Sequence, residues 1–418
     1  MREADGQPER TQVTVAEARD TVLASVKALG SETLSLRDAL GRVLAEEVRS
    51  KRWIPPLDNS AMDGFALRVE DVREPPAQLR VVEELPAGRR SERKLGPGEA
   101  ARIMTGAAIP EGADAVVMQE HTERSGQHVI VQQPVELGQN IRRAGADVRS
   151  GTVVAASGSV LRPAQIGMLA AIGRTTLQVV TRPRVAILAT GDELVEPDQL
   201  ADDGRIASSN SYALQAALQE LGAEPVYLGI APDEPQAIAE CFRRALHCDV
   251  VISTGGVSVG DRDWIKVVLA ELGGSMRLWR VRMKPGAPLA FAVLQDRPVF
   301  GLPGNPVSTL VTFEQFVRPA LLRMMRRPRV FRPVTSATLA VDFDKPAGRM
   351  HFVRVMLQER EGRCIAFPTG DQSSGVLLSM VRADGLAVVP AEATHLDAGS
   401  EVTVQLLGGE DLRVDPGF

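Results

Sequence analysis

A glycine-rich segment directly follows a short apolar run near the middle of the chain. The run Val250–Ile252 ends at Ser253–Asp263 (STGGVSVGDRD), after which an amphipathic stretch begins at Trp264. A strand, a glycine loop and a helix start in that order place free backbone N–H groups and the positive end of a helix dipole at one point. Such a point suits a phosphate, and the neighbouring carboxylates suit a divalent cation. The segment therefore predicts phosphate–metal chemistry on an α/β sheet.

The surrounding residues, 182–327, alternate between apolar runs and amphipathic stretches. The strand-like runs are Val185–Leu188, Pro225–Leu228, Val250–Ile252 and Pro298–Phe300. The helical stretches are Ser211–Leu221, Gln236–Leu246, Trp264–Leu272 and Pro306–Met325. This alternation predicts a parallel, doubly wound α/β domain.

The rest of the 418 residues predicts further domains, since a single compact core does not extend over such a length. Helices are expected over Val13–Leu29 and Leu36–Val48, and Trp53–Pro56 marks a boundary. Short strands are expected at Leu79–Leu85, Glu99–Met104, Ala115–Gln119 and Val129–Val131, and a helix at Pro163–Ile172. The expected division is a mixed linking region (1–50 and 148–181), an inserted β-rich domain (51–147), the α/β domain (182–327) and a C-terminal β domain (328–418).

Four strand-end loops of the α/β domain carry polar residues. They are Thr190–Glu193, Gly229–Pro235, Ser253–Asp263 and Gly301–Ser308. Each loop alone would be explained as a helix cap or a tight turn. Ligands of open α/β sheets lie beyond the carboxyl ends of the strands, so several such loops predict one shared phosphate and Mg²⁺ site. Arg280, Arg282 and Lys284 alternate along an expected strand and would neutralise the bound anion.

A second interpretation of Gly256–Gly260 is the GxSxG elbow of a serine hydrolase, with Ser258 as nucleophile. That elbow requires an aspartate and then a histidine later in the chain. The later histidines, His351 and His395, lie in the predicted C-terminal β domain, which disfavours a hydrolase.

The composition limits the partners and the compartment. A net charge of −5 and a pI near 5.7 disfavour a general nucleic-acid or anionic-membrane surface. The three cysteines include no CxxC pair, which is typical of reduced thiols in the cytoplasm. No signal peptide and no apolar run of roughly 18 residues is found, so a cytoplasmic protein is expected.

The motifs as a set resemble the molybdopterin molybdenumtransferases, that is, the bacterial MoeA type and the E domains of gephyrin and its plant counterpart. The matching segments are Pro55–Ala66 (PPLDNSAMDGFA), Arg102–Ala107 (RIMTGA), Asn140–Arg143 (NIRR), Thr190–Leu194 (TGDEL), Ser253–Asp263, Lys284–Gly286 (KPG) and Leu302–Ser308 (LPGNPVS). They occur in the family's order over roughly residues 13–410.

The resemblance implies insertion of molybdate into adenylylated molybdopterin with release of AMP, the last step of molybdenum cofactor synthesis. It also implies an elongated homodimer of four-domain chains with a site shared between subunits, and an upstream molybdopterin adenylyltransferase. In this interpretation Glu193, Asp233 and Asp263 hold Mg²⁺, and Asp263, Glu193 and Asp58 are catalytic. The implied substrate-binding residues are Asn59, Ser60, Thr105, Arg142, Arg143, Thr190, Gly191, Gly255, Gly256, Ser258, Arg280, Lys284, Pro303, Gly304, Asn305 and Ser308.

Three positions depart from the family pattern: Ala287 replaces a second lysine, Ser208 replaces an acidic or amide residue, and Ala144 interrupts the arginine run. A lost lysine removes one positive charge from an oxyanion site, which could change affinity. Two alternatives therefore stay open: a relative that handles tungstate or a variant pterin, and a non-catalytic protein that stores or assembles the cofactor.

Overall fold

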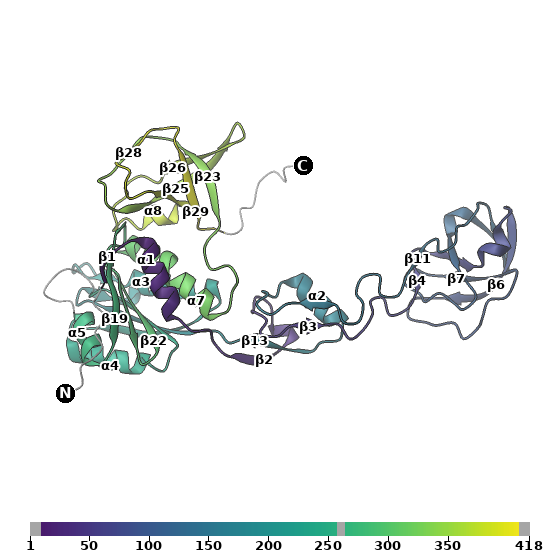
Figure 1. The fold of residues 1–418 in the computed structure, drawn as a ribbon, viewed down its shortest axis with the longest axis horizontal. Coiled ribbons are helices and arrows are strands. Elements are labelled where there is room, and N and C mark those ends of the chain that lie inside the picture. Colours follow the sequence, from purple (N-terminus) through teal and green to yellow (C-terminus); the bar gives the residue numbers. More distant parts are fainter. Residues whose placement is uncertain (1–9, 257–263, 409–418) are drawn as a thin grey trace. The chain divides into compact units, whose positions relative to one another are not determined.

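The structure is a computed structural model that describes residues 10–256 and 264–408. Contacts divide the chain into two compact units, Met1–Glu32 with Val180–Phe418 (unit 1) and Thr33–Val179 (unit 2). Figure 1 shows the elements of both units. No helix in the described residues combines the length and the apolarity that a membrane span requires.

A mixed sheet of seven strands, counted over the described residues, forms the centre of unit 1. In spatial order its strands are β1 (Arg10–Val13), β19 (Ser275–Val281), β21 (Ala290–Leu294), β22 (Arg297–Leu302), β18 (Val250–Thr254), β14 (Arg184–Thr190) and β17 (Glu224–Ala231). The four strands predicted from the sequence, β22, β18, β14 and β17, are parallel neighbours.

The expectation of a purely parallel sheet is wrong at the other edge. There β21 runs antiparallel to both β22 and β19. The two-residue loop Gln295–Asp296 joins β21 to β22, and its φ angles of 48° and 63° are those of a type I′ hairpin. The pair Gln-Asp lacks the Asn-Gly signature that normally identifies this turn in a sequence, which explains why the antiparallel hairpin was not predicted.

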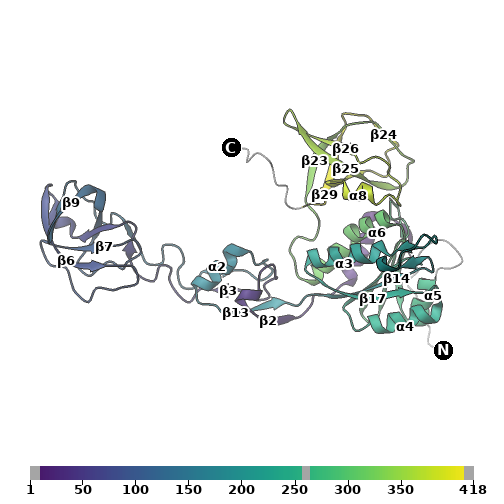
Figure 2. The ribbon, with the colours of Figure 1, turned by 180° about the vertical axis from the view of Figure 1, so that it is seen from behind.

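Helices cover both faces of the sheet, as a doubly wound domain requires. They are α1 (Val15–Ser25), α3 (Ser209–Leu221), α4 (Pro235–Ala245), α5 (Trp264–Glu271), α6 (Pro306–Thr312) and α7 (Arg318–Met324), with the π-helical turn η5 (Phe313–Val317) joining the last two. Figure 2 shows α4 and α5 on one face and α3 and α6 on the other. Ile238 and Phe242 of α4 and Leu269 of α5 are buried against sheet residues such as Leu188.

The N-terminal helix belongs to unit 1, which differs from the expected assignment of residues 1–50 to the linking region. Thr14 and Glu17 form a capping box that starts α1, within the helix predicted over Val13–Leu29. Val15 and Val22 of α1 are buried, and α1 contacts β19, α7 and η5. This burial explains why α1 belongs to unit 1, together with the seven-stranded sheet. The other expected domain boundaries stay predictions.

The C-terminal β domain is a barrel. Its six strands over residues 283–406 are β20 (Met283–Lys284), β25 (Met350–Arg360), β26 (Arg363–Pro368), β23 (Val334–Leu339), β29 (Glu401–Leu406) and β27 (Gly385–Val389). The sheet closes because β25 also pairs with β27. The barrel also includes the pair β24 (Phe343–Asp344) and β28 (His395–Leu396), and helix α8 (Leu378–Val381).

The predicted single strand through Arg280 and Lys284 is wrong. Arg280 has a φ of 66°, which interrupts the extended backbone at the end of β19. Lys284 therefore lies on a different sheet, where β20 pairs in parallel with β25. Arg280 and Lys284 consequently do not share the face of one strand.

The β-rich part of unit 2 has six strands over residues 64–131. In spatial order they are β8 (Ala115–Met118), β5 (Gly64–Leu67), β7 (Glu99–Ile103), β6 (Ala77–Leu85), β10 (His128–Val131) and β9 (Thr122–Ser125), with the 3₁₀ turns η2 (Val69–Val72) and η3 (Gln119–His121). The predicted strands are confirmed to within about two residues. Gly64 is required at the start of β5, because a Cβ atom there would lie 1.9 Å from the carbonyl oxygen of Val117.

The remaining part of unit 2 contains short strands and one helix. They are β2 (Ser31–Ser35), the 3₁₀ turn η1 (Leu36–Asp38), β3 (Val48–Arg49), β12 (Val153–Ala155), α2 (Pro163–Ala171) and β13 (Thr176–Val180). The helix α2 confirms the prediction for Pro163–Ile172. The helix predicted for Leu36–Val48 is wrong beyond η1. There Gly41 has a φ of 74°, and Val43 and Leu44 form β-bridges to Val160 and Val179, which bury both side chains.

Candidate active site

A cavity of about 630 Å³, here called the main cavity, lies where the parallel strands of unit 1 end. The loops after β14, β18 and β22 line it, together with β16 (Ile206–Ala207) and the start of α3; the same region also includes β15 (Leu194–Val195) and the turn η4 (Pro197–Gln199). The predicted site residues that line it are Thr190, Gly191, Glu193, Asp233, Gly255, Gly256, Pro303, Gly304 and Asn305. The structure thus brings most of the site residues predicted in the α/β domain to one cavity.

Two glycines allow the loops after β14 and β18 to approach each other. Gly255 has a φ of 92°, and a Cβ atom there would lie 2.3 Å from the carbonyl oxygen of Thr190. A Cβ atom at Gly191 would lie 2.7 Å from Oε2 of Glu193. A larger residue at either position would force the cavity wall apart.

Thr190 presents an unused polar group to the main cavity. Its side chain is only 2% exposed, and its Oγ1 has no hydrogen-bond partner among the described residues. A buried hydroxyl without a partner costs free energy unless a ligand or water supplies one. Thr190 can therefore donate to, or accept from, a ligand bound in the main cavity.

Asn210 is a further member of the main cavity that the sequence-based site did not include. Its Nδ2 donates to Oγ1 of Thr254 at 2.9 Å and to the carbonyl oxygen of Gly304 at 2.7 Å. The first turn of α3 is thereby tied to the loops after β18 and β22. Its place in the triplet Ser208–Asn210 was the available sequence signal.

Two carboxylates, Glu193 and Asp233, line the main cavity. The backbone N–H of Asp233 donates to Oδ1 of Asp192 at 3.1 Å, which fixes the loop after β17 next to the loop after β14. The third predicted metal ligand, Asp263, and the predicted phosphate ligand Ser258 lie in residues 257–263, outside the described part of the chain. Their placement stays a prediction.

No lysine or arginine is among the described residues that line the main cavity. Arg280 is half-buried at the end of β19, and Lys284 lines a separate cavity in the barrel. Ser308 is buried on α6, where its carbonyl oxygen accepts from Oγ1 of Thr312 at 2.7 Å. The structure does not bring these three predicted residues to the main cavity.

The predicted residues of unit 2 form their own cluster around the short pair β4 (Asn59–Ser60) and β11 (Ile141–Arg142). Asp58 accepts from Arg143 Nη1 at 2.6 Å and from the Ala144 N–H at 2.7 Å. The pKa of Asp58 is lowered, mainly because the Ala144 N–H donates to its carboxylate. Arg142 lies opposite Asn59 in the ladder. Asp58 is therefore ionised and held in place within unit 2.

The other two predicted residues of this cluster have local roles. Both the N–H and the hydroxyl of Thr105 donate to Oδ1 of Asp63 at 2.7 Å, which lowers the pKa of Asp63. Ser60 is fully buried, and its hydroxyl donates to the carbonyl oxygen of Met62 at 2.5 Å, so it shapes the turn. Oδ1 of Asn59 is buried without a partner among the described residues and is available to a ligand.

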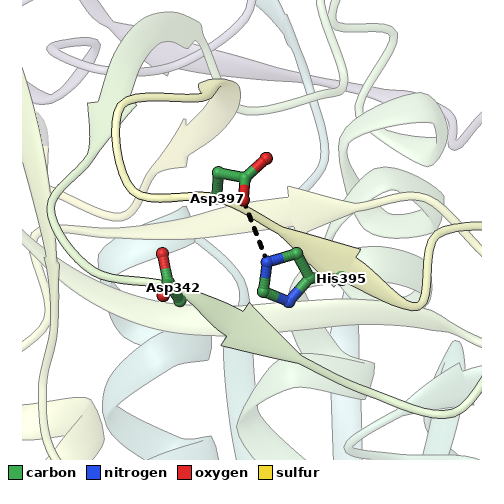
Figure 3. Close-up of side chains that lie close together, drawn as sticks. All are labelled: Asp342, His395 and Asp397. Atoms are coloured by element: carbon green, nitrogen blue, oxygen red, sulfur yellow. Dashed lines mark hydrogen bonds and ion pairs between the residues drawn. The ribbon is translucent and has the colours of Figure 1, made fainter.

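In the described residues, the side chains arranged closely enough to hold a metal ion lie elsewhere, on the barrel. They are Asp342, His395 and Asp397, shown in Figure 3. Both ring nitrogens of His395 already contact carboxylates, Nδ1 with Asp344 at 2.7 Å and Nε2 with Asp397 at 3.1 Å. The hydrogen bond to Asp344, and then that to Asp397, raises the pKa of His395. The arrangement favours an imidazolium that links β24 to the turn after β28.

Comparisons with known proteins agree with this architecture. Residues 13–173 match the family described as "MoeA N-terminal region (domain I and II)", residues 186–323 the "Probable molybdopterin binding domain", and residues 336–407 the "MoeA C-terminal region (domain IV)". A molybdopterin molybdenumtransferase of Nostoc sp. is 39% identical, with 90% of this chain and 88% of the relative aligned. One from Bacillus subtilis is 36% identical over 96% of both chains.

A solved structure shows the same fold at full length. The molybdopterin biosynthesis MoeA protein of Pyrococcus horikoshii superposes with a TM-score of 0.83 at 33% identity, covering 96% of this chain and all of that one. These matches span the α/β domain, the inserted β-rich domain and the barrel in the same order. The chain belongs to the MoeA family of molybdopterin molybdenumtransferases.

Proposed function

We propose that this protein inserts molybdate into adenylylated molybdopterin and releases AMP, as the final step of molybdenum cofactor synthesis. As a member of its family the chain is an enzyme, a transferase that acts on molybdopterin. The adenylylated form of the substrate, the metal dependence and the shared site are finer points, and each needs its own support.

The observation that carries the proposal is the main cavity itself. At about 630 Å³ it is large enough for a nucleotide-sized ligand. Glycine-rich loops line its wall, and the unpartnered hydroxyl of Thr190 is available to a ligand. Such groups suit the pyrophosphate linkage of an adenylylated substrate. Thr190, Gly191, Gly255 and Gly256 would hold the phosphate oxygens.

The donor set of the main cavity fits Mg²⁺. Proteins usually bind this ion through one or two carboxylates together with substrate phosphates, and Glu193 and Asp233 supply two such carboxylates. Asp263 would be a third ligand. Bound Mg²⁺ would neutralise charge on the phosphates and stabilise the departing AMP.

Among the described residues, the lining of the main cavity includes carboxylates but no lysine or arginine. A polyanionic substrate beside Glu193 and Asp233 requires positive charge, of which Mg²⁺ would supply a part. We propose that a second copy of the chain presents its Asp58–Arg143 cluster to this cavity, so that the enzyme is a homodimer with shared sites. In this arrangement Asn59, Thr105, Arg142 and Arg143 would contact molybdate or phosphate.

The substrate must come from a reaction that joins AMP to molybdopterin, so we propose a molybdopterin adenylyltransferase as the upstream partner. A cytoplasmic location, where the three free cysteines would stay reduced, fits this supply and stays a prediction.

The test is an assay of AMP release from adenylylated molybdopterin, with molybdate and tungstate compared side by side at controlled Mg²⁺. We expect Glu193→Gln and Asp233→Asn each to lower the rate of AMP release about a hundredfold. Part of this rate should return when the Mg²⁺ concentration is raised. Glu196→Gln is the matched control, because Glu196 follows in the same loop, bonds to Tyr212 and Tyr227, and does not line the main cavity.

Two outcomes would contradict the proposal. If the wild-type protein released no AMP with either oxyanion, a storage or assembly role would be favoured. If Glu193→Gln kept full activity at limiting Mg²⁺, the metal assignment would be wrong.

A further inference from the structure

The helical segment α6–η5–α7 begins at the main cavity and contacts the barrel at its start and again near its middle. The first residue of α6 lines the main cavity, and so does Gly375 of the barrel. At the start of the segment, the N–H of Val307 donates to the carbonyl oxygen of Ser374 at 3.1 Å. In the π-helical turn, Nε2 of Gln315 donates to Oε1 of Gln405 in β29 at 2.6 Å. One helical segment thus links the wall of the main cavity to a barrel strand.

Gln405 is buried on the outer face of the barrel. Side chains alternate along β29, and Val402 and Val404 belong to the barrel core, so Gln405 points away from that core. Even so, it is only 6% exposed, and Leu386, its ladder partner on β27, is fully buried. This outer face is therefore covered, and the hydrogen bond to Gln315 identifies the π-helical turn as a covering element.

Gln315 is fully buried, and both ends of its amide are used. Nη2 of Arg19 on α1 donates to its Oε1. Because a guanidinium has only donors, this bond fixes the orientation of the amide, so that Nε2 faces Gln405. The bonds from Arg19 through Gln315 to Gln405 therefore run in one direction and join α1, the π-helical turn and β29. Loss of the Gln315 amide would remove a partner from both neighbours, which is costly for buried polar groups.

The π-helical turn also anchors residues 326–333, which link α7 to the barrel. Glu314 accepts from two nitrogens of Arg332, at 2.9 and 3.0 Å, and both side chains are nearly buried. Arg19 lies over the ring of Phe331, 5.3 Å from its centroid. π-Helical turns are rare and occur frequently at functional sites. Here α1, the link to the barrel and the barrel itself meet at this one turn.

We propose that Gln315 is a positioning residue of the active site. Through Gln405 it holds the barrel to the helical segment that begins at the main cavity, and so keeps the barrel residue Gly375 at the cavity wall. Gln315 is not among the described residues that line the main cavity, so its effect must pass through these neighbours. The inference rests on the proposed function only in its effect on AMP release, and the hold on the barrel is tested separately.

The structural test is amide hydrogen exchange on the full-length protein, with the Val307 N–H as the reporter. An N–H in the first turn of a helix has no partner within the helix, so the carbonyl oxygen of Ser374 protects this one. Gln315→Met keeps the length of the side chain and loses both hydrogen bonds. We expect exchange at Val307 to become about tenfold faster, as for the loss of roughly one hydrogen bond. Amides of the β25–β27 ladder should exchange as in the wild type.

Gln358→Met is the matched control. Exposed Gln358 on β25 accepts from Arg360 at 2.9 Å, so the substitution removes the same kind of bond from the barrel, at a position outside the contact with the π-helical turn. Its exchange at Val307 should equal that of the wild type. Gln405→Met removes the central bond from the barrel side. It should reproduce the effect of Gln315→Met, and it serves as the informative variant if the latter does not fold.

The kinetic test separates positioning from a general loss of stability. We expect Gln315→Met to raise the KM for the adenylylated substrate about tenfold with little change in kcat, because the cavity wall shifts while Glu193 and Asp233 stay in place. Gln315→Glu should restore the KM, since its carboxylate still accepts from Arg19 and the amide of Gln405 can turn to donate to it. A merely structural role would lower the amount of folded enzyme and leave the KM unchanged.

The inference is overturned if exchange at Val307 is unchanged in both Gln315→Met and Gln405→Met. It is equally overturned if Val307 and the β25–β27 ladder gain exchange to the same extent, or if Gln358→Met has the same effect. Faster exchange at Val307 with a wild-type KM would overturn the role in the active site. If the wild-type protein released no AMP, the proposed function would fail, and the exchange rates would still decide whether Gln315 holds the barrel.

Discussion

Gly255 and Thr190 are so close that a Cβ atom on Gly255 would lie 2.3 Å from the carbonyl oxygen of Thr190 and 3.0 Å from its Oγ1. The contact joins the ends of β18 and β14 at the wall of the main cavity. The same Oγ1 is the buried hydroxyl without a partner in the described residues. The hydroxyl of Thr190, a proposed binding group, can therefore occupy its position only because Gly255, directly after β18, has no Cβ atom.

We expect Gly255→Ala to lower the free energy of unfolding by about 3 kcal/mol, through left-handed strain and displacement of the β14 loop. It should also lower AMP release. Gly229→Ala is the control, because Gly229 has nearly the same φ (93°) but nothing within 4 Å of an added Cβ. Its cost should be about 1 kcal/mol, measured by urea unfolding. If both variants lost the same free energy of unfolding, the close contact with Thr190 would contribute nothing to stability.

Asn210 should position the loops of the main cavity. Asn210→Ala removes its bonds to Thr254 and Gly304, and we expect a loss of about 2 kcal/mol in unfolding free energy and a raised KM for the adenylylated substrate. Asn305→Ala, which loses one bond to Ser374 Oγ, should cost about 1 kcal/mol. A KM for Asn210→Ala equal to that of the wild type would contradict the positioning role.

A shared active site predicts complementation between inactive variants. When Asp58→Ala and Glu193→Ala proteins are mixed equally and allowed to exchange subunits, half of the dimers are mixed and each has one intact site, so about a quarter of the wild-type activity should return. Mixing Glu193→Ala with Asp233→Ala should restore none, because both changes lie in unit 1. No recovery in the first mixture, with subunit exchange verified by mass, would exclude sharing through Asp58.

His395 should make the barrel's stability depend on pH. Its pKa is raised in the folded protein, mainly by Asp344, so its contribution is fully present below the unfolded pKa near 6.5 and is lost as pH rises through the folded pKa. We expect His395→Asn to be less stable than the wild type at pH 5.5, with the difference vanishing at high pH. Asp344→Asn should shrink the same difference. A gap between wild type and His395→Asn that is independent of pH would contradict the linkage.

Much of the architecture followed from local patterns. The parallel strands, the proline-started helices α4 and α6, and the strands of the β-rich domain were predictable because hydrophobic periodicity and helix-start residues act over a few neighbours. The helix predicted over Leu36–Val48 was wrong because pairing with a distant segment overrides the local pattern there. Its apolar residues are buried by β-bridges to a segment more than a hundred residues away, which no local pattern reveals.

The sequence by itself determined the family, the doubly wound domain and the loops that meet at the strand ends, since glycines, carboxylates and apolar runs recur at meaningful spacings. Only the tertiary structure decided which of those residues share a cavity. The positive φ of Arg280 sends Lys284 to the barrel, and packing leaves Oγ1 of Thr190 and Nε2 of His351 without partners among the described residues. Such facts depend on how distant segments pack, because a hydrogen bond or its absence is settled by atoms that the chain brings together only on folding.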